Sequence, residues 1–226
     1  IINILKRLKI NQPSSCRYLW KRGENDITFG SSPEKLFSLR DNTISLEAIA
    51  GTTKNDQRMN HLLKSKKNLR EHNLVIKYLI DILELYKVNN LRKSRIKIIP
   101  FGNIAHLSTS ITGNIECNCP FELLDVLHPS PAVCGYPKKE ALRWISTLES
   151  FDRDNYAAPI GWVDSEGDAD FRVALRGARL MNNEIELSAG SGLVKGSICE
   201  EEIDEIKLKF ESLTKEICAE DLINNF

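Results

Sequence analysis

The chain has no excess of charge of either sign. Its 31 lysine and arginine residues balance its 31 aspartate and glutamate residues, so no net field would gather a polyanion such as nucleic acid. No apolar run approaches the roughly 20 residues that a membrane-spanning helix requires. We therefore expect a monomeric, cytoplasmic protein that binds a small polar metabolite and neither nucleic acid nor membrane.

Several common enzyme motifs are also absent from the sequence, namely the HExxH zinc motif, the phosphate-binding P-loop and a Ser/His/Asp nucleophile signature. Its six cysteines are irregularly spaced and suggest no disulfide framework, and Cys117 and Cys119 are too close for an ordinary zinc knuckle. We expect free thiols. The chain begins with Ile1 rather than methionine, so we expect a fragment that is truncated at its amino terminus.

Hydrophobic periodicity and the placement of Pro and Gly predict blocks of strands separated by helices. The expected strands, the first three of them forming an antiparallel meander, are 27–31, 36–39, 43–50, 95–100, 104–115, 159–164, 170–175, 179–181 and 184–188. The expected helices are 57–88 as one helix or two end to end, 138–148, and 200–219 with an apolar stripe of Ile203, Ile206, Phe210, Leu213 and Ile217. This order favours one α+β domain over 1–226, with antiparallel β-sheets and helices packed outside.

Acidic residues at separate places in the chain are candidates for chemistry. Glu47 ends a predicted strand among apolar neighbours that could hold its carboxyl in a pocket, as a general acid requires; an outward-facing glutamate is the alternative. Glu202, Glu205 and Lys209 recur at helical spacing and share one face of the closing helix. Facing carboxylates from two helices, with Glu71 on the second, would suit Mg²⁺, whereas a solvated charged face is the other interpretation.

A glycine-rich run at 188–197 precedes the closing helix and could bring backbone N–H groups close to an anion. The run lacks a dinucleotide-binding or Walker spacing, so it is a weak signal by itself. Arg176 ends a predicted strand and could bind a carboxylate with both of its forked nitrogens, or form a surface salt bridge. His106 and Tyr156 could line a pocket or pack in the core.

Taken in order, several segments resemble the chorismate-utilising enzymes, the family of isochorismate, salicylate, anthranilate and aminodeoxychorismate synthases. The segments are FGSSPE at 29–34, EAIAGT at 47–52, EH at 71–72, HLST at 106–109, LHPSPAVCG at 127–135, 151–162, ALR at 174–176 and 189–197. The resemblance runs nearly end to end. It implies a chorismate-binding catalytic domain with the fold of anthranilate synthase component I.

The resemblance also implies roles that spacing leaves open. Two carboxylates, those of Glu71 and Glu205, would hold Mg²⁺ with assistance from Glu202. The residues that would bind the carboxylate and enolpyruvyl groups of chorismate, or form the pocket wall beside them, are Arg176, Lys209, Gly190, Gly192, His106 and Ala132.

Within the family, Glu47 resembles the glutamate of isochorismate and salicylate synthases, where anthranilate synthases have Arg and many aminodeoxychorismate synthases have Lys. The resemblance implies an isochorismate synthase in which water adds at C2 of chorismate and Glu47 protonates the departing C4 hydroxyl. The alternatives are a salicylate synthase and a non-catalytic chorismate-binding subunit. The family's general-base lysine would precede Ile1, so we expect these residues alone to be weakly active or inactive. The resemblance also implies that the product feeds quinone or siderophore synthesis.

Overall fold

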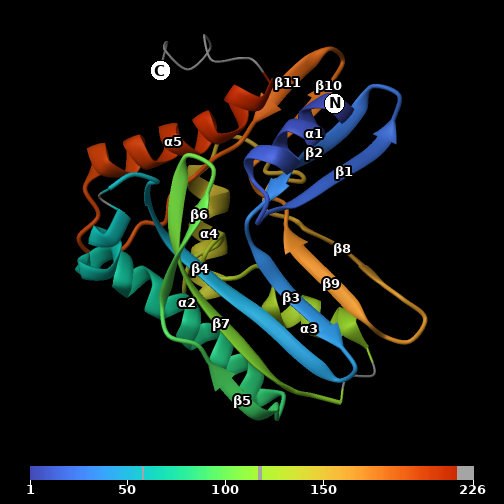
Figure 1. Cartoon of the computed structure of the whole chain (residues 1–226), viewed down its shortest axis with the longest axis vertical. Helices are drawn as coiled ribbons and strands as arrows, with labels where there is room; N and C mark the ends of the chain where they lie inside the picture. Colours follow the sequence, from blue (N-terminus) through green and yellow to red (C-terminus); the bar gives the residue numbers. More distant parts are fainter. Residues whose placement is uncertain (58, 117–118, 218–226) are drawn as a thin grey trace.

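The computed structural model describes residues 1–57, 59–116 and 119–217, which form two antiparallel β-sheets with helices against them (Figure 1). The four-stranded sheet has the order β1 (Cys16–Gly23), β2 (Asp26–Ser32), β10 (Gly177–Met181) and β11 (Glu184–Leu187). The seven-stranded sheet runs β5 (Asn89–Lys93), β7 (Ile104–Asn114), β4 (Thr43–Lys54), β3 (Lys35–Arg40), β9 (Ala169–Val173) and β8 (Pro159–Val163), with β6 (Lys97–Phe101) paired to β7. The predicted α+β class is confirmed.

The helices are α1 (Ile2–Asn11), the 3₁₀ helix η1 (Met59–Lys64), α2 (Lys66–Leu85), α3 (Pro120–Leu127), α4 (Lys138–Leu148) and α5 (Cys199–Ile217). The main core lies between α2 and the larger sheet, where Val75, Leu79 and Leu83 pack in one cluster with Leu46 and Ala48 of β4. This is the face that the helical spacing of α2 predicts. In the described ranges, no helix is both long and apolar enough to cross a membrane.

The predicted helix over 57–88 is two segments end to end, one of the two arrangements expected. Ser65 separates η1 from α2, and its hydroxyl accepts a hydrogen bond from the Asn68 backbone N–H at 3.3 Å. A serine in this place satisfies one of the free N–H groups at a helix start. The cap therefore fixes where α2 begins and which residues lie on its first turn.

The expected meander of the first strands is wrong, because β2 belongs to the smaller sheet whereas β3 and β4 belong to the larger one. The chain passes from one sheet to the other at Pro33 and Glu34. Four elements were not predicted, namely α1, β1, β5 and α3. Pro120 occupies the first turn of α3, where a missing N–H costs nothing.

The predicted apolar stripe of α5 is buried only in part, at Leu213 with Ile217 packed against the same core cluster, and the helix buries acidic residues as well. Glu202, Glu205 and Glu216 are buried together with Leu213, whereas Ile203 keeps 46% of its surface exposed. The acidic face turns inward because lysines meet it there, as described below. The last predicted helical residues, 218 and 219, lie outside the described residues, as do Cys117 and Cys218; the four described cysteines are free thiols.

Candidate active site

One cavity of about 170 Å³ lies between the two sheets' connecting segments and the amino-terminal part of α2. Seven of the residues singled out from the sequence line it: Glu71, His106, Ala132, Arg176, Gly190, Gly192 and Lys209. They come from α2, β7, the segment after α3, the β9–β10 connection, the glycine-rich segment and α5. Tyr156 lines the same cavity, whereas the candidates Glu47, Glu202 and Glu205 are not among its lining residues. The structure therefore gathers residues that are far apart in the chain.

Arg176 and His106 form the cationic end of this cavity. The Arg176 Nη2 group donates to His106 Nε2 at 3.1 Å, so Nδ1 of the imidazole carries the proton and faces the Gly51 carbonyl at 3.3 Å. Burial, with the charges of Arg176 and Lys209, lowers the pKa of His106 well below its usual value, which keeps the ring neutral. Burial also lowers the pKa of Arg176 to about 10, so the guanidinium stays charged at neutral pH.

The position of Arg176 corrects the expectation that it ends a strand. β9 ends at Val173, and Arg176 lies in the connection to β10 with a backbone φ of 50°. This left-handed conformation is uncommon for a residue with a side chain and is retained where surrounding structure enforces it. It places the guanidinium in the cavity, with His106 as its partner.

Lys209 connects the cationic end to the carboxylates. Its Nζ lies 2.6 Å from Glu205 Oε1, one helical turn earlier on α5, and donates to the Gly190 carbonyl at 2.7 Å. Burial lowers the pKa of Lys209, and the charge of Glu205 opposes that effect. The ammonium thus fixes the glycine-rich segment against α5 while it faces the cavity.

Three carboxylates from two helices converge on one further lysine, Lys67 of α2. Its Nζ lies 2.7 Å from Glu202 Oε1, 3.7 Å from Glu71 Oε2 and 4.0 Å from Glu205 Oε2. Burial, and next the charge of Glu205, raise the pKa of Glu71 to about 7. Burial opposes ionisation of Glu202 as well, but the hydrogen bond from Lys67 leaves its pKa below the usual value.

The carboxylate cluster suits a hard divalent cation by its chemistry, since Mg²⁺ prefers carboxylate oxygens and retains water in its shell. Glu71 Oε2 is buried and accepts no hydrogen bond from any described residue. Among the residues that the structure describes, however, no group of acidic, histidine or cysteine side chains is drawn together at metal-binding distances. The ammonium of Lys67 lies among these oxygens instead.

The glycine-rich segment passes so close to α2 that one of its glycines cannot be replaced without movement. A Cβ on Gly192 would lie 2.6 Å from Glu71 Oε1, well inside contact distance. A Cβ on Gly190 would meet the Tyr156 hydroxyl at an ordinary 3.4 Å. The sequence indicated the run as a whole, and the structure identifies Gly192 as the position where an added Cβ would force the Glu71 side chain to move.

Glu47 differs from the other candidates and corrects two expectations. It lies in the middle of β4 rather than at a strand end, is half-buried, and is not among the residues that line the cavity. The Ser108 hydroxyl donates to Glu47 Oε1 at 2.6 Å. Glu47 shares its face of β4 with Ile49, which does line the cavity, so its carboxyl lies beside the cavity rather than in its wall.

Two further cavity-side residues were missed from the sequence, Glu34 and Lys67. Glu34 is buried in the lining, and its burial raises its pKa to about 7 against the opposing charge of Arg176. Its signal was its place after Pro33 between two strands. Lys67 follows Lys66 in the first turn of a helix, where the helix dipole disfavours cations. A lysine in such a position needs an acidic partner nearby. This need is the feature of the sequence that could have pointed to Lys67.

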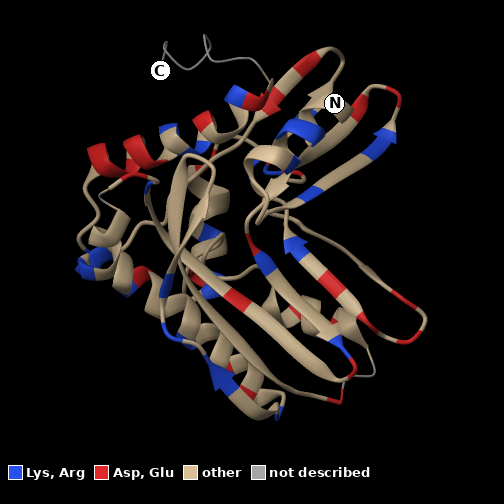
Figure 2. Ribbon diagram, in the orientation of Figure 1, with Lys and Arg blue, Asp and Glu red and all other residues tan. Residues whose placement is uncertain are grey.

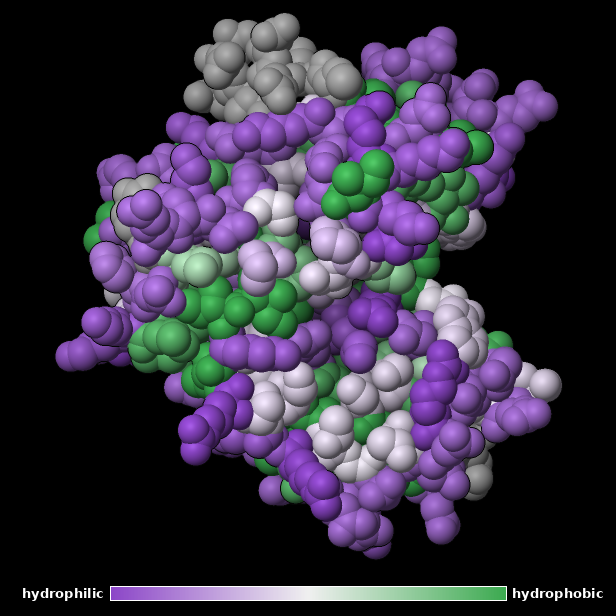
Figure 3. Space-filling view, viewed as in Figure 1, coloured by the Kyte–Doolittle hydropathy of each residue, from purple (hydrophilic) through white to green (hydrophobic). Residues whose placement is uncertain are grey.

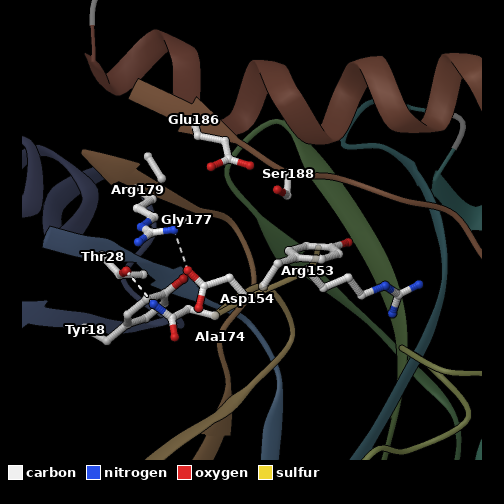
Figure 4. Close-up of a pocket in the computed structure, with 12 residues that line it drawn as sticks. Tyr18, Thr28, Arg153, Asp154, Ala174, Gly177, Arg179, Glu186 and Ser188 are labelled. Carbon is white, nitrogen blue, oxygen red and sulfur yellow. Dashed lines mark hydrogen bonds and ion pairs between the residues drawn. The ribbon is translucent and has the colours of Figure 1, made fainter. Parts of the chain in front are cut away.

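A smaller cavity, of about 40 Å³, borders the first one (Figure 4). Arg153, Tyr156 and Ser188 line both cavities. On its far side Arg179 forms an ion pair with Asp154 at 2.5 Å, drawn as a dashed line in Figure 4. This ion pair attaches the segment that carries Arg153 and Tyr156 to the smaller sheet.

Comparisons with known proteins agree on one family. The model of the family described as chorismate binding enzyme matches residues 1–218. The salicylate biosynthesis isochorismate synthase of Pseudomonas aeruginosa is 34% identical over 231 residues, covering 96% of this chain and 47% of that protein. The isochorismate synthase MenF of Bacillus subtilis is 34% identical over 222 residues, covering 91% of this chain and 46% of that protein.

Solved structures give the same result. The menaquinone-specific isochorismate synthase MenF of Escherichia coli matches with a TM-score of 0.84 at 27% identity, over 95% of this chain and 51% of that one. Anthranilate synthase component I of Streptococcus pneumoniae matches with a TM-score of 0.80 at 26% identity, over 93% and 48%. The chain spans about half the length of the relatives that it matches.

Proposed function

The chain belongs to the chorismate binding enzyme family, and from this premise we propose that it is the catalytic portion of a Mg²⁺-dependent isochorismate synthase. The observation that carries the proposal is the cavity lined by Arg176, Lys209 and Glu71. Glu202 and Glu205 are outside its lining and are joined to it by their ion pairs with Lys67 and Lys209. The names of the similar proteins and the glutamate at position 47 support the same reaction.

The charges suit chorismate, a cyclic molecule with two carboxylates. Arg176 and Lys209 supply positive charge on the cavity wall, and the backbone at Gly190 and Gly192 allows close approach. His106 is neutral and oriented by two hydrogen bonds, so it forms wall rather than a second cation. We assign substrate binding to these four residues with His106 and Ala132 beside them.

Mg²⁺, when bound, would neutralise and polarise the ring carboxylate of the substrate, and Glu71, Glu202 and Glu205 would hold it. Glu47 acts as the general acid that protonates the C4 hydroxyl as it leaves, while water adds at C2. The hydrogen bond from Ser108 orients the Glu47 carboxyl. The proton lost by the attacking water needs a base, which we assign to none of the described residues.

Product analysis tests this function. The protein, expressed in its native reading frame, is incubated with chorismate and Mg²⁺, and its products are separated by liquid chromatography. We expect isochorismate to form and persist. Salicylate that accumulates with only transient isochorismate would identify a salicylate synthase, and Mg²⁺-dependent chorismate binding without turnover would identify a non-catalytic subunit; either result overturns the proposal. Gel filtration of the same sample tests the expected monomer.

A further inference from the structure

Lys67 occupies the position in the carboxylate cluster where a cation is required. Its side chain keeps only 18% of its surface exposed, and those of Glu71, Glu202 and Glu205 keep 14%, 6% and 10%. Carboxylates this close and this buried repel one another strongly unless a positive charge lies between them. The ammonium supplies that charge from inside the chain.

The contacts of Lys67 are uneven. It makes a close ion pair with Glu202 at 2.7 Å, whereas the nearest oxygens of Glu71 and Glu205 lie 3.7 and 4.0 Å away. Glu71 Oε2 accepts no hydrogen bond from a described residue, and Glu205 has a closer partner, since Lys209 lies 2.6 Å from its other oxygen. The Lys67 ammonium therefore offsets part of the negative charge of the cluster and leaves Glu71 Oε2 without a hydrogen bond from a described residue.

The charges of the cluster favour replacement of the Lys67 ammonium by a divalent cation over binding of both at once. With all three carboxylates ionised, Lys67 and Lys209 leave one negative charge unbalanced. A divalent cation in place of the Lys67 ammonium would balance the three carboxylates together with Lys209. A divalent cation beside Lys67 would instead bring like charges within a few ångströms in a largely buried space, which is costly.

The local fold makes departure of Lys67 feasible. Lys67 is the second residue of α2, and the positive end of the helix dipole disfavours an ammonium there. Its long flexible side chain can swing to solvent without moving the backbone, whereas the glutamates are held on two packed helices. The lysine is therefore the movable member of the cluster.

We propose that Lys67 is the internal counter-ion of the metal-free protein, and that Mg²⁺ binds by displacing the Lys67 ammonium from Glu71, Glu202 and Glu205. Lys67 is thus a positioning residue that keeps the metal ligands together between occupancies. This inference rests on the metal assignment in the proposed function. It predicts competition between a lysine side chain and a dissolved ion for the same carboxylates.

The test compares Lys67→Met with Lys66→Met, which removes the same charge from the exposed neighbouring position on the same helical turn. In Lys67→Met we expect a lower melting temperature without metal and about tenfold tighter Mg²⁺ binding by calorimetry, a coupling of ordinary size. Lys66→Met should match the wild type. Mass-spectrometric acylation of wild-type lysines gives a second readout, in which added Mg²⁺ should raise labelling of Lys67.

Unchanged or weaker Mg²⁺ binding in Lys67→Met, or Lys67 labelling that Mg²⁺ does not alter, would overturn the inference, because a permanently fixed lysine behaves so. Failure of the proposed function looks different. If the wild type binds Mg²⁺ and Lys67 behaves as expected but chorismate is not converted, the exchange stands without the reaction. If the wild type binds no Mg²⁺, the metal assignment fails and the inference fails with it.

Discussion

The two ends of the cavity are built in different ways. At the cationic end, Arg176 is held by His106, and His106 in turn by the Gly51 carbonyl, so each polar group has a fixed partner. At the acidic end, Glu71 lines the cavity and lies 3.7 Å from Lys67. Glu202 and Glu205, outside the lining, pair closely with Lys67 and Lys209. The difference indicates that one end is ready for an anion before it arrives, whereas the other is completed by what binds there.

Glu205 belongs to both ends, since its two oxygens face Lys67 and Lys209. Of the variants considered, Glu205→Ala should have the largest effect, because it alters both ends. We expect loss of Mg²⁺-dependent activity and loss of measurable Mg²⁺ binding, because a ligand is removed and a buried ammonium is left unpaired. Calorimetric Mg²⁺ titration measures the effect, with exposed Glu201→Ala on the same helix as control. A metal titration unchanged from the wild type would contradict the metal assignment.

Glu47 is not among the residues that line the cavity, so its replacement separates chemistry from binding. For Glu47→Gln we expect turnover to fall by about 10² to 10⁴ while chorismate affinity changes little, because a proton donor is lost and the shape is kept. Steady-state kinetics and equilibrium binding give the two quantities. The matched variant Ser108→Ala removes only the orienting hydrogen bond and should cost less. An active Glu47→Gln variant would remove Glu47 from the mechanism.

The glycine-rich segment joins the two ends, since Gly190 contacts Lys209 and Gly192 contacts Glu71. Gly192→Ala should displace the Glu71 carboxylate and destabilise the fold by about 2 kcal/mol, as overpacking usually does. Gly190→Ala is the internal control, since its Cβ would meet only an ordinary contact. Thermal unfolding and Mg²⁺ affinity are measured for both variants. Equal effects at the two positions would show that close approach at Gly192 is not the cause.

Glu34 provides the smallest test, at the cationic end. Its folded pKa of about 7 lies above the ordinary glutamate pKa of 4.5, so the folded state holds a proton that the unfolded state has already lost between these pH values. Stability from this group is therefore present below pH 4.5 and lost as pH rises through about 7, with a slope of at most ~1.4 kcal/mol per pH unit.

Glu34→Gln should flatten that part of the curve of unfolding free energy against pH, measured in denaturant without metal. Glu71 has a raised pKa for similar reasons, so part of the slope should remain in the variant. A slope unchanged by Glu34→Gln would show that Glu34 does not titrate in this range. The test sharpens the comparison, because it asks whether the cationic end also contains a group sensitive to protons.

The sequence predicted the helices that have a long hydrophobic periodicity or a clear boundary residue. α4 has the predicted bounds, and α2 buries the expected apolar residues, because Pro137 and the repeated leucines act locally. α3 was not predicted because proline usually interrupts helices, whereas Pro120 lies in the first turn, where a helix tolerates it. The division of the first strands between two sheets depends on pairing of β2 with β10, about 150 residues away, which no local pattern contains.

The sequence predicted which residues form the candidate site better than it predicted how they are arranged. The family resemblance identified most of the lining, but the acidic face of α5 was not expected to be the buried one, and Lys67 was not singled out. Both follow from a tertiary contact between α2 and α5 that pairs charges. Polar residues buried in this way are invisible to periodicity because hydrophobic patterns assign them to solvent. Hydrophilic residues cover much of the face in Figure 3, and Figure 2 shows the acidic residues at the start of α5.

The spacing of the three functional residues on α5 has a consequence for how related chains can vary. Glu202, Glu205 and Lys209 share a face because seven residues make nearly two helical turns. A single inserted or deleted residue between them would rotate Lys209 by about 100° around the helix, away from the cavity. This stretch should therefore tolerate many substitutions at its outward positions but no change of length.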